Sequence, residues 1–160
     1  MSIERVRRFF KEYQMEERIL EFPVSSATVE LAAQAVGCEP ARIAKTLSFL
    51  ADGGAVLIVA AGDAKVDNAR YKAYFHTKAK MLTPEQVTEL IGHSIGGVCP
   101  FAVNEGVRVF LDESLKRFET VYPACGSGNS AICLNMEELE RYAKPEAWID
   151  VCKGWRPEEK

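Results

Sequence analysis

The sequence predicts a mixed α/β domain whose sheet is mixed or largely antiparallel. Its 160 residues are 48% hydrophobic, which is enough to bury a core within one domain. Helix-like and strand-like patterns alternate irregularly, which does not suit a doubly wound parallel sheet. The longest apolar run, residues 55–61, has the length of a buried strand and is too short to cross a membrane. Since no repeat or linker divides the chain, we expect a single domain over residues 1–160.

Helices are predicted where apolar residues recur at helical spacing. The first has four such residues at i, i+3, i+4 and i+7: Val6, Phe9, Phe10 and Tyr13. Much of its remaining surface is basic: Arg5, Arg7, Arg8 and Lys11. A second helix is expected to begin near Ser26, a good N-cap, and to end at Gly37. Further helices are expected over 68–75, after the capping box at Thr83 and after the cap at Asn135.

Strands are predicted in the stretches between these helices. The segment RILEFPV indicates a short strand stopped by Pro23. The runs IAKTLSFL and AVLIVAA are joined by Asp52-Gly53-Gly54, a pattern typical of a hairpin. Three more strands are expected at VRVFL, FETVY and SAICL, and AWIDVC is expected to form the last one.

Charge excludes some classes of function. With 20 Lys+Arg against 23 Asp+Glu, the net charge of −3 argues against a general basic surface that coats nucleic acid. A local basic patch that meets a structured RNA stays compatible with it. The N-terminus MSIERVRRFF is charged and lacks the apolar core of a signal peptide. We therefore expect a cytoplasmic protein with neither a membrane nor DNA as partner.

Cysteine and histidine usage bears on metals and nucleophiles. The cysteines have no CxxC spacing and read as reduced thiols: Cys38, Cys99, Cys125, Cys133 and Cys152. The two histidines, His76 and His93, belong to no ligand array, so we expect no metal, no cofactor and no histidine-based triad. No histidine lies close in sequence to Cys99 or Cys125, which argues against a cysteine nucleophile at either position.

A lysine in an apolar strand is the first candidate for chemistry. Lys45 lies in Ile43-Ala44-Lys45-Thr46-Leu47, and strand alternation places it on the same side as Ile43 and Leu47. Lysine is rarely fully buried, because its charge is costly in apolar surroundings. Lys45 is therefore either at a sheet edge, or packed by its stem with the ammonium in water, or in a cleft where it meets an anionic or carbonyl group.

Two glycine-containing loops are the next candidates. GHSIGGVCPF (92–101) combines adjacent glycines with Pro100, so its backbone amides can approach a ligand carbonyl oxygen closely. ACGSGNS (124–130) lies between two predicted strands. Each also fits a plain connecting turn. Neither is a phosphate-binding P-loop, because neither opens a long helix with a GKS/T ending.

The fourth candidate is a basic segment over residues 65–80. It holds five cations against the single acid Asp67: Lys65, Arg70, Lys72, Lys78 and Lys80. Four rings are interleaved with them: Tyr71, Tyr74, Phe75 and His76. Cations for phosphates and rings for stacking are what an RNA end needs. A solvated helix face with its aromatic residues in the core is the alternative.

Taken in order, five segments resemble one known family. AKTL, AGDAKVDN, GHSIGGVCPF, VFLDESL and VYPACGSGNSAI are similar to the YbaK/EbsC family, over about residues 25–148. That family includes free-standing aminoacyl-tRNA deacylases and the editing insertion domain of bacterial prolyl-tRNA synthetases. The resemblance implies a compact fold around a mixed, barrel-like sheet and hydrolysis of amino acids wrongly attached to tRNA, without metal or other cofactor.

The resemblance also implies roles for individual residues. The family's lysine falls on Lys45, with Thr46 beside it, and its GXXXP loop on residues 96–100. Its second glycine loop falls on residues 125–127. Catalysis is then expected from Lys45, Gly96 and Gly126. Substrate binding is expected from the neighbouring residues Thr46, Gly97, Pro100 and Ser127. This chain has Cys125 where Gly or Ala is more usual, which bears on pocket size and the amino acid preferred.

The function expected from the resemblance is trans-editing of tRNA for proline that carries a small amino acid such as alanine or cysteine. The expected partners are the aminoacyl-tRNA acceptor end and prolyl-tRNA synthetase. Two alternatives use the same cleft without turnover: a module that senses tRNA or a nucleotide, and a regulatory partner that docks on a synthetase through the basic segment.

Overall fold

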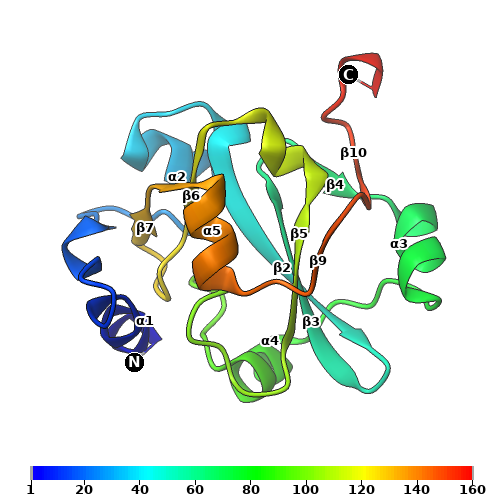
Figure 1. Cartoon of the computed structure of the whole chain (residues 1–160), viewed down its shortest axis with the longest axis horizontal. Helices are drawn as coiled ribbons and strands as arrows, with labels where there is room; N and C mark the ends of the chain where they lie inside the picture. Colours follow the sequence, from blue (N-terminus) through cyan, green and yellow to red (C-terminus); the bar gives the residue numbers. More distant parts are fainter. Residues whose placement is uncertain (1, 160) are drawn as a thin grey trace.

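The computed structural model describes residues 2–159 as a curled sheet with helices packed around it (Figure 1). The α-helices are α1 (Ser2–Lys11), α2 (Val29–Val36), α3 (Asn68–Phe75), α4 (Pro84–Gln86) and α5 (Met136–Ala143). A π-helical turn, Val87–Ile91, extends α4, and 3₁₀ turns cover Glu16–Arg18, Pro40–Arg42, Glu113–Arg117 and Pro157–Glu159. Within this described part, no helix has the length and apolar character needed to cross a bilayer.

The main sheet has six strands of mixed direction. Their order is β8 (Leu134–Asn135), β6 (Thr120–Pro123), β2 (Ile43–Ala51), β3 (Gly54–Ala61), β5 (Arg108–Asp112) and β9 (Ala147–Ile149). Pairs β2–β3 and β6–β8 are antiparallel, whereas β2–β6, β3–β5 and β5–β9 are parallel. Two short antiparallel pairs lie beside this sheet: β1 (Ile19–Glu21) with β7 (Ser130–Ile132), and β4 (Lys65–Val66) with β10 (Cys152–Lys153). The predicted mixed α/β class is confirmed, and its parallel pairs are joined by long crossovers, as parallel strands require.

The hairpin of β2 and β3 forms the centre of the sheet. Its turn residues Asp52 and Gly53 both have positive φ, 52° and 76°, which matches the right-handed twist of the strands they join. The register runs from Ala51 opposite Gly54 to Ala44 opposite Ala61. Every residue from Ala55 to Ala61 is at most 5% exposed, because β3 is covered on both faces. The apolar run that the sequence predicts as a buried strand is therefore confirmed.

Two aromatic clusters attach helices to the sheet and loops. Phe75 of α3 lies 4.5 Å from Tyr71 and 5.1 Å from Phe110 of β5, measured between ring centroids. Phe10 of α1 lies 4.9 Å from Phe101 and 5.5 Å from Tyr142 of α5. The Phe75–Phe110, Phe10–Phe101 and Phe10–Tyr142 pairs are edge-to-face, and such pairs add about 0.5–1.5 kcal/mol each beyond the burial of their area. As a result α1 and α3 are fixed on opposite sides of the molecule (Figure 1).

Four predicted elements differ in detail. SAICL, expected as one strand, contributes to β7 and β8, which belong to different sheets. The N-cap of α2 is Thr28, whose hydroxyl accepts from the Leu31 amide, and not Ser26. α1 ends at Lys11, so Tyr13, which the prediction included, lies beyond the observed helix. AWIDVC forms two strands in two sheets, because the amide of Val151, between β9 and β10, donates to the Asp112 carboxylate at 3.0 Å and turns the chain.

Asp112 is the buried acceptor that joins β5 to this C-terminal segment. Its side chain is fully buried and also accepts from the Ser114 amide at 2.9 Å. We predict that Asp112→Ala lowers the free energy of unfolding by about 2–4 kcal/mol, because two amides lose their acceptor. Urea unfolding of Asp112→Ala beside Glu119→Ala, an exposed acid, measures this loss. Equal unfolding midpoints for the two variants would contradict the assignment.

Candidate functional site

A cavity of about 360 Å³ lies along the edge of β2, beyond the point where its pairing with β6 ends. β6 pairs with β2 only at Ile43 and Ala44, and the next bridge on that side joins Phe49 to Met81. The edge of β2 between these points faces the cavity, which also has walls from residues 26–29, from the first glycine loop and from β7. We call this space the Lys45 cavity, because Lys45 is the only charged residue among those that line it within residues 2–159.

Lys45 is half-buried and anchored by backbone oxygens. Its Nζ donates to the carbonyl of Gly62 at 3.3 Å and to that of Ala64, both in the segment that follows β3. Burial lowers the pKa of the Lys45 ammonium, and the charges of Cys152 and Asp63 act in the opposite direction. An ammonium has three N–H groups, so one donor remains for a ligand. Of the three positions the sequence allows, the cleft position is the observed one.

Hydroxyl-bearing residues also line the Lys45 cavity: Thr46, which the sequence analysis named for substrate binding, and Ser26, which it did not name for the site. The Oγ atoms of Ser26 and Thr46 are buried and have no hydrogen-bond partner within the described residues. A buried hydroxyl without a partner costs about 1–3 kcal/mol, which a polar ligand can recover. Ser130, 1% exposed, contributes a third hydroxyl that bonds Ser127 at 2.7 Å. For Ser26 the only sequence signal was its position before a helix, which predicted an N-cap.

The two glycine loops pack backbone against backbone. A Cβ on Gly97 would lie 2.5 Å from the Ser127 nitrogen, so only glycine allows this contact. Gly96, at φ 92°, lines the Lys45 cavity, whereas Gly97 and Pro100 are buried behind it. The structure therefore brings together the loops that the sequence singled out, with different roles for their residues.

Gly126 and Ser127 face a second hollow and not the Lys45 cavity. This hollow of about 600 Å³ lies beside α1 and is called the α1 hollow below. Gly126, at φ 92°, packs against α1, where a Cβ would lie 2.7 Å from the Ser2 carbonyl oxygen. The expected catalytic residues are thus split, with Lys45 and Gly96 at the cavity and Gly126 at the hollow. The expected substrate-binding residues Thr46 and Ser127 are divided in the same way.

Neither cysteine of the loops is placed to react. Burial raises the pKa of Cys99 to about 12 and raises the pKa of Cys125 well above its usual value. His93 Nε2 lies 3.6 Å from Cys99 Sγ, although the two residues are six positions apart in the sequence. His93 is itself buried, which lowers its pKa, and Nε2 is 2.8 Å from the Phe101 oxygen. A neutral imidazole supplies no charge to stabilise a thiolate. Cys125 also does not line the Lys45 cavity, so it does not set its size directly.

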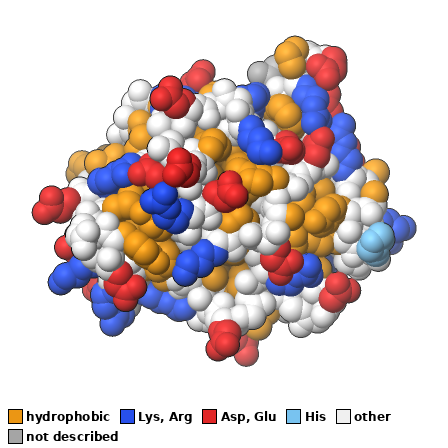
Figure 2. All heavy atoms as spheres, in the orientation of Figure 1, with side chains coloured by type: hydrophobic (Ala, Val, Ile, Leu, Met, Phe, Trp, Pro, Cys, Tyr) orange, Lys and Arg blue, Asp and Glu red, His pale blue; other side chains and the backbone are white. Residues whose placement is uncertain are grey.

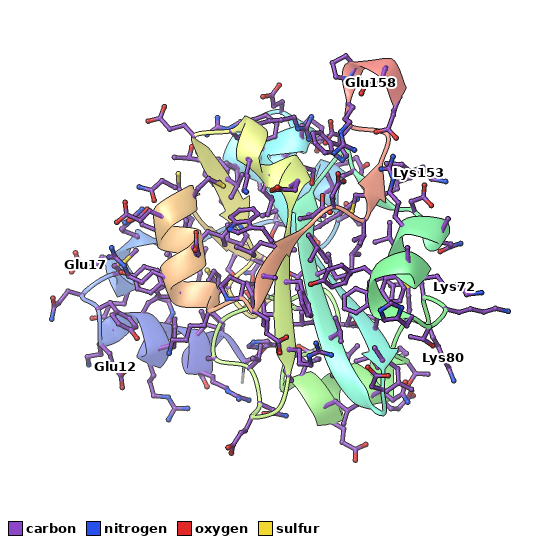
Figure 3. The ribbon with its side chains drawn as sticks, turned by 45° about the vertical axis from the view of Figure 1, so that its right-hand side comes forward. Glu12, Glu17, Lys72, Lys80, Lys153 and Glu158 are labelled. Atoms are coloured by element: carbon purple, nitrogen blue, oxygen red, sulfur yellow. The ribbon has the colours of Figure 1, made fainter. Side chains whose placement is uncertain are left out.

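The basic segment 65–80 is only partly available to a partner. Arg70 donates to the Cys152 oxygen at 2.6 Å and pairs with Glu159 at 3.2 Å, which ties down the C-terminal segment. Tyr71 and Phe75 point into the core, whereas Tyr74 and His76 are exposed, so the alternative interpretation holds for only two of the four rings. Four lysines are exposed: Lys65, Lys72, Lys78 and Lys80. Figure 3 shows Lys72 and Lys80 projecting from the side that carries α3.

The described residues offer no ready metal centre. Between residues 2 and 159, no three His, Cys, Asp or Glu side chains are grouped so that they could hold an ion. The polar groups of the Lys45 cavity are an ammonium and hydroxyls, which suit a carbonyl or an anion.

The chain belongs to the aminoacyl-tRNA editing domain family, whose model matches residues 24–142. A crystal structure of a proposed trans-editing enzyme for prolyl tRNA synthetase superposes with a TM-score of 0.85 and 30% identity, covering 96% of this chain and 98% of that one.

Sequence relatives agree with this family. An uncharacterized Bacillus subtilis protein, YwhH, is 53% identical over 97% of this chain and 99% of its own length. The proline–tRNA ligase of Thermosipho melanesiensis is 29% identical over 89% of this chain, and the match spans 25% of that ligase. That of Leuconostoc citreum is 34% identical over 54% of this chain and 15% of its own length.

Gly97 provides a test of the contact between the loops. We predict that Gly97→Ala lowers the free energy of unfolding by about 1–3 kcal/mol, because the new methyl group meets backbone that cannot move aside cheaply. Gly54→Ala is the matched control, since its Cβ would lie 3.9 Å from the Ala51 oxygen, an ordinary van der Waals contact. Urea unfolding of both variants measures the difference. If Gly97→Ala is as stable as Gly54→Ala, the loops do not pack as described.

Proposed function

We propose that this chain is a free-standing deacylase that hydrolyses the ester of mischarged tRNA in trans. The expected substrate is tRNA for proline carrying alanine or cysteine, and the whole of residues 1–160 acts as one editing domain in the cytoplasm. Membership of the editing family and the similarity to proline–tRNA ligases support this proposal. The synthetase that makes such errors, prolyl-tRNA synthetase, is the partner that this substrate implies.

The anchored ammonium of Lys45 is the observation that carries the proposal. Two backbone carbonyls hold it, and Lys45 lines an otherwise uncharged cavity. In this proposal its remaining N–H meets the ester carbonyl or the terminal phosphate region. Charge is worth more in such a site than in water, because less solvent screens it. An aminoacyl ester is already reactive, so orientation and stabilisation of the developing oxyanion supply the help it needs.

Hydrolysis breaks the bond between the acyl carbon and the ribose oxygen. The nucleophile is water, the neighbouring ribose hydroxyl or, for cysteine, the substrate's own thiol; a transfer to the hydroxyl or thiol is completed by water. The departing ribose oxygen takes up a proton. Lys45 acts by holding the ester in position, and the backbone at Gly96 lines the same cavity.

The residues that line the cavity favour a substrate with a small amino-acid side chain. Five alanines contribute to it: Ala27, Ala32, Ala44, Ala124 and Ala131. The space of about 360 Å³ also has to receive part of the terminal ribose. Since one methylene is worth only about 1–3 kcal/mol in such a pocket, selectivity among small side chains depends on contacts with the unpaired hydroxyls of Ser26 and Thr46.

Single-turnover deacylation tests the proposed reaction. The panel is tRNA for proline charged with alanine, cysteine, serine, threonine or proline. We predict rapid release of one small amino acid and a loss of at least about a hundredfold in Lys45→Ala, as for removal of one oxyanion-stabilising donor. The controls are the wild-type protein and Arg141→Ala, a substitution of an exposed residue on α5. Turnover by Lys45→Ala within a few-fold of wild type would refute the role of Lys45. Binding of every charged tRNA without release would favour the sensing module.

The lowered pKa of Lys45 predicts a pH dependence of binding. The protonated ammonium binds the substrate, so affinity is lost as pH rises through a pKa that lies below the ordinary 10.5. The affinity for a non-hydrolysable alanyl-amide analogue of the tRNA end, measured from neutral to alkaline pH, should fall before an ordinary lysine titrates. Lys45→Arg stays charged in this range, so its affinity should stay level. A fall of equal size at equal pH in both proteins would contradict the assignment.

A further inference from the structure

We propose that the α1 hollow binds the phosphate of the 3′-terminal nucleotide of tRNA through Arg5 and Arg8. This inference rests on the proposed function and extends it, since it concerns how the same substrate is held. The basic surface of α1 was evident in the sequence, and the resemblance to the editing family gave it no role.

The charge of the α1 hollow favours an anion. Arg5 and Arg8 line it together with residues of both glycine loops, and no carboxylate is among its lining residues within 2–159. Arg5 is held in place, since its Nη2 donates to the Asn104 side-chain oxygen at 3.0 Å. Arg8 is exposed on the next turn of the helix. Figure 2 shows Lys and Arg side chains gathered at the lower left, where Figure 1 places α1. Two guanidinium groups facing one hollow match the geometry that phosphate recognition uses.

The position of the hollow links it to the Lys45 cavity. Ser94 lines the hollow and Ile95 lines the cavity; Gly128 lines the hollow and Ser130 the cavity. Consecutive Cα atoms are about 3.8 Å apart, so each loop passes from one space to the other within one or two residues. The packed glycine loops are therefore a thin wall. An aminoacyl group in the cavity places the attached ribose at this wall and its 5′-phosphate on the side of α1.

A buried histidine at the hollow supplies an independent sign of a polar ligand. His93 lines the hollow and is 1% exposed. The 2.8 Å contact of Nε2 with the Phe101 oxygen assigns the proton to Nε2, which leaves Nδ1 as an acceptor. This Nδ1 is buried without a partner among residues 2–159. Because an unsatisfied acceptor is costly, a donor is expected there, and a ribose brings hydroxyl donors together with its phosphate.

Binding of an uncharged acceptor hairpin ending in CCA tests the inference without requiring turnover. Arg8→Glu should weaken binding about tenfold or more and reduce the slope of log affinity against log salt by about 1. The matched control is Arg141→Glu, the same charge reversal on α5 outside both spaces, which should bind within about twofold of wild type. An Arg8→Glu protein that binds like Arg141→Glu would overturn the proposal.

A second RNA locates the phosphate. The hairpin carries an uncharged methylphosphonate in place of the phosphate before the terminal adenosine. Its affinity for the wild-type protein should be about as low as the affinity of the natural hairpin for Arg8→Glu. Combining the methylphosphonate hairpin with Arg8→Glu should lower the affinity little further. Additive losses of affinity would place Arg8 at another phosphate and overturn the assignment.

Competition with inorganic phosphate distinguishes the two sources of the anion. If inorganic phosphate displaces neither hairpin, the nucleotide is supported as the ligand. Full displacement would indicate a site for free phosphate instead. If these results hold while no charged tRNA is hydrolysed, the subsite stands and the deacylase proposal fails.

Discussion

The ammonium of Lys45 reaches its place because the backbone after β3 turns two carbonyl groups toward it. That turn depends on Gly62, where a Cβ would lie 2.0 Å from the Pro40 oxygen and 2.8 Å from Val29 Cγ1. The absence of a side chain lets the end of β3, the turn at residues 40–42 and α2 meet closely. Val29 and Ala32 of α2, which packs against Gly62, also line the Lys45 cavity.

The glycine loops complete this arrangement from the other side. Their direct backbone contact at Gly97 and Ser127 makes a wall between the Lys45 cavity, which has Lys45 as the only charged lining residue within residues 2–159, and the hollow lined by Arg5 and Arg8. The 3′ end of an aminoacyl-tRNA has two parts of different polarity. The ester linkage is uncharged, although the amino acid carries an amino group, and the phosphate of the terminal nucleotide is anionic. Binding both parts across one thin wall fixes the ester bond with few groups, which is sufficient for an ester that is already activated.

Much of this could be predicted from the sequence. Local signals gave the hairpin at Asp52-Gly53, the caps at Thr83 and Asn135, and the mixed α/β class, because turn and cap chemistry acts within a few residues. The ordered motifs gave the family. The division of the site could not be predicted, because which hollow Gly126 faces depends on α1, more than a hundred residues away in sequence. The structural use of Arg70 also depends on a distant partner, Glu159. No local pattern signals the buried hydroxyl of Ser26 or the approach of His93 to Cys99.

A crystal structure with 3′-alanylamido-adenosine 5′-phosphate would test the account most directly, since the amide resists hydrolysis and keeps the carbonyl. We predict that the alanyl group lies in the Lys45 cavity with its carbonyl oxygen within hydrogen-bond distance of Lys45 Nζ. The phosphate should lie across the glycine loops toward Arg8. An analogue bound with its aminoacyl group outside the cavity, or with Lys45 still contacting only the carbonyls of Gly62 and Ala64, would contradict the central role given to this lysine.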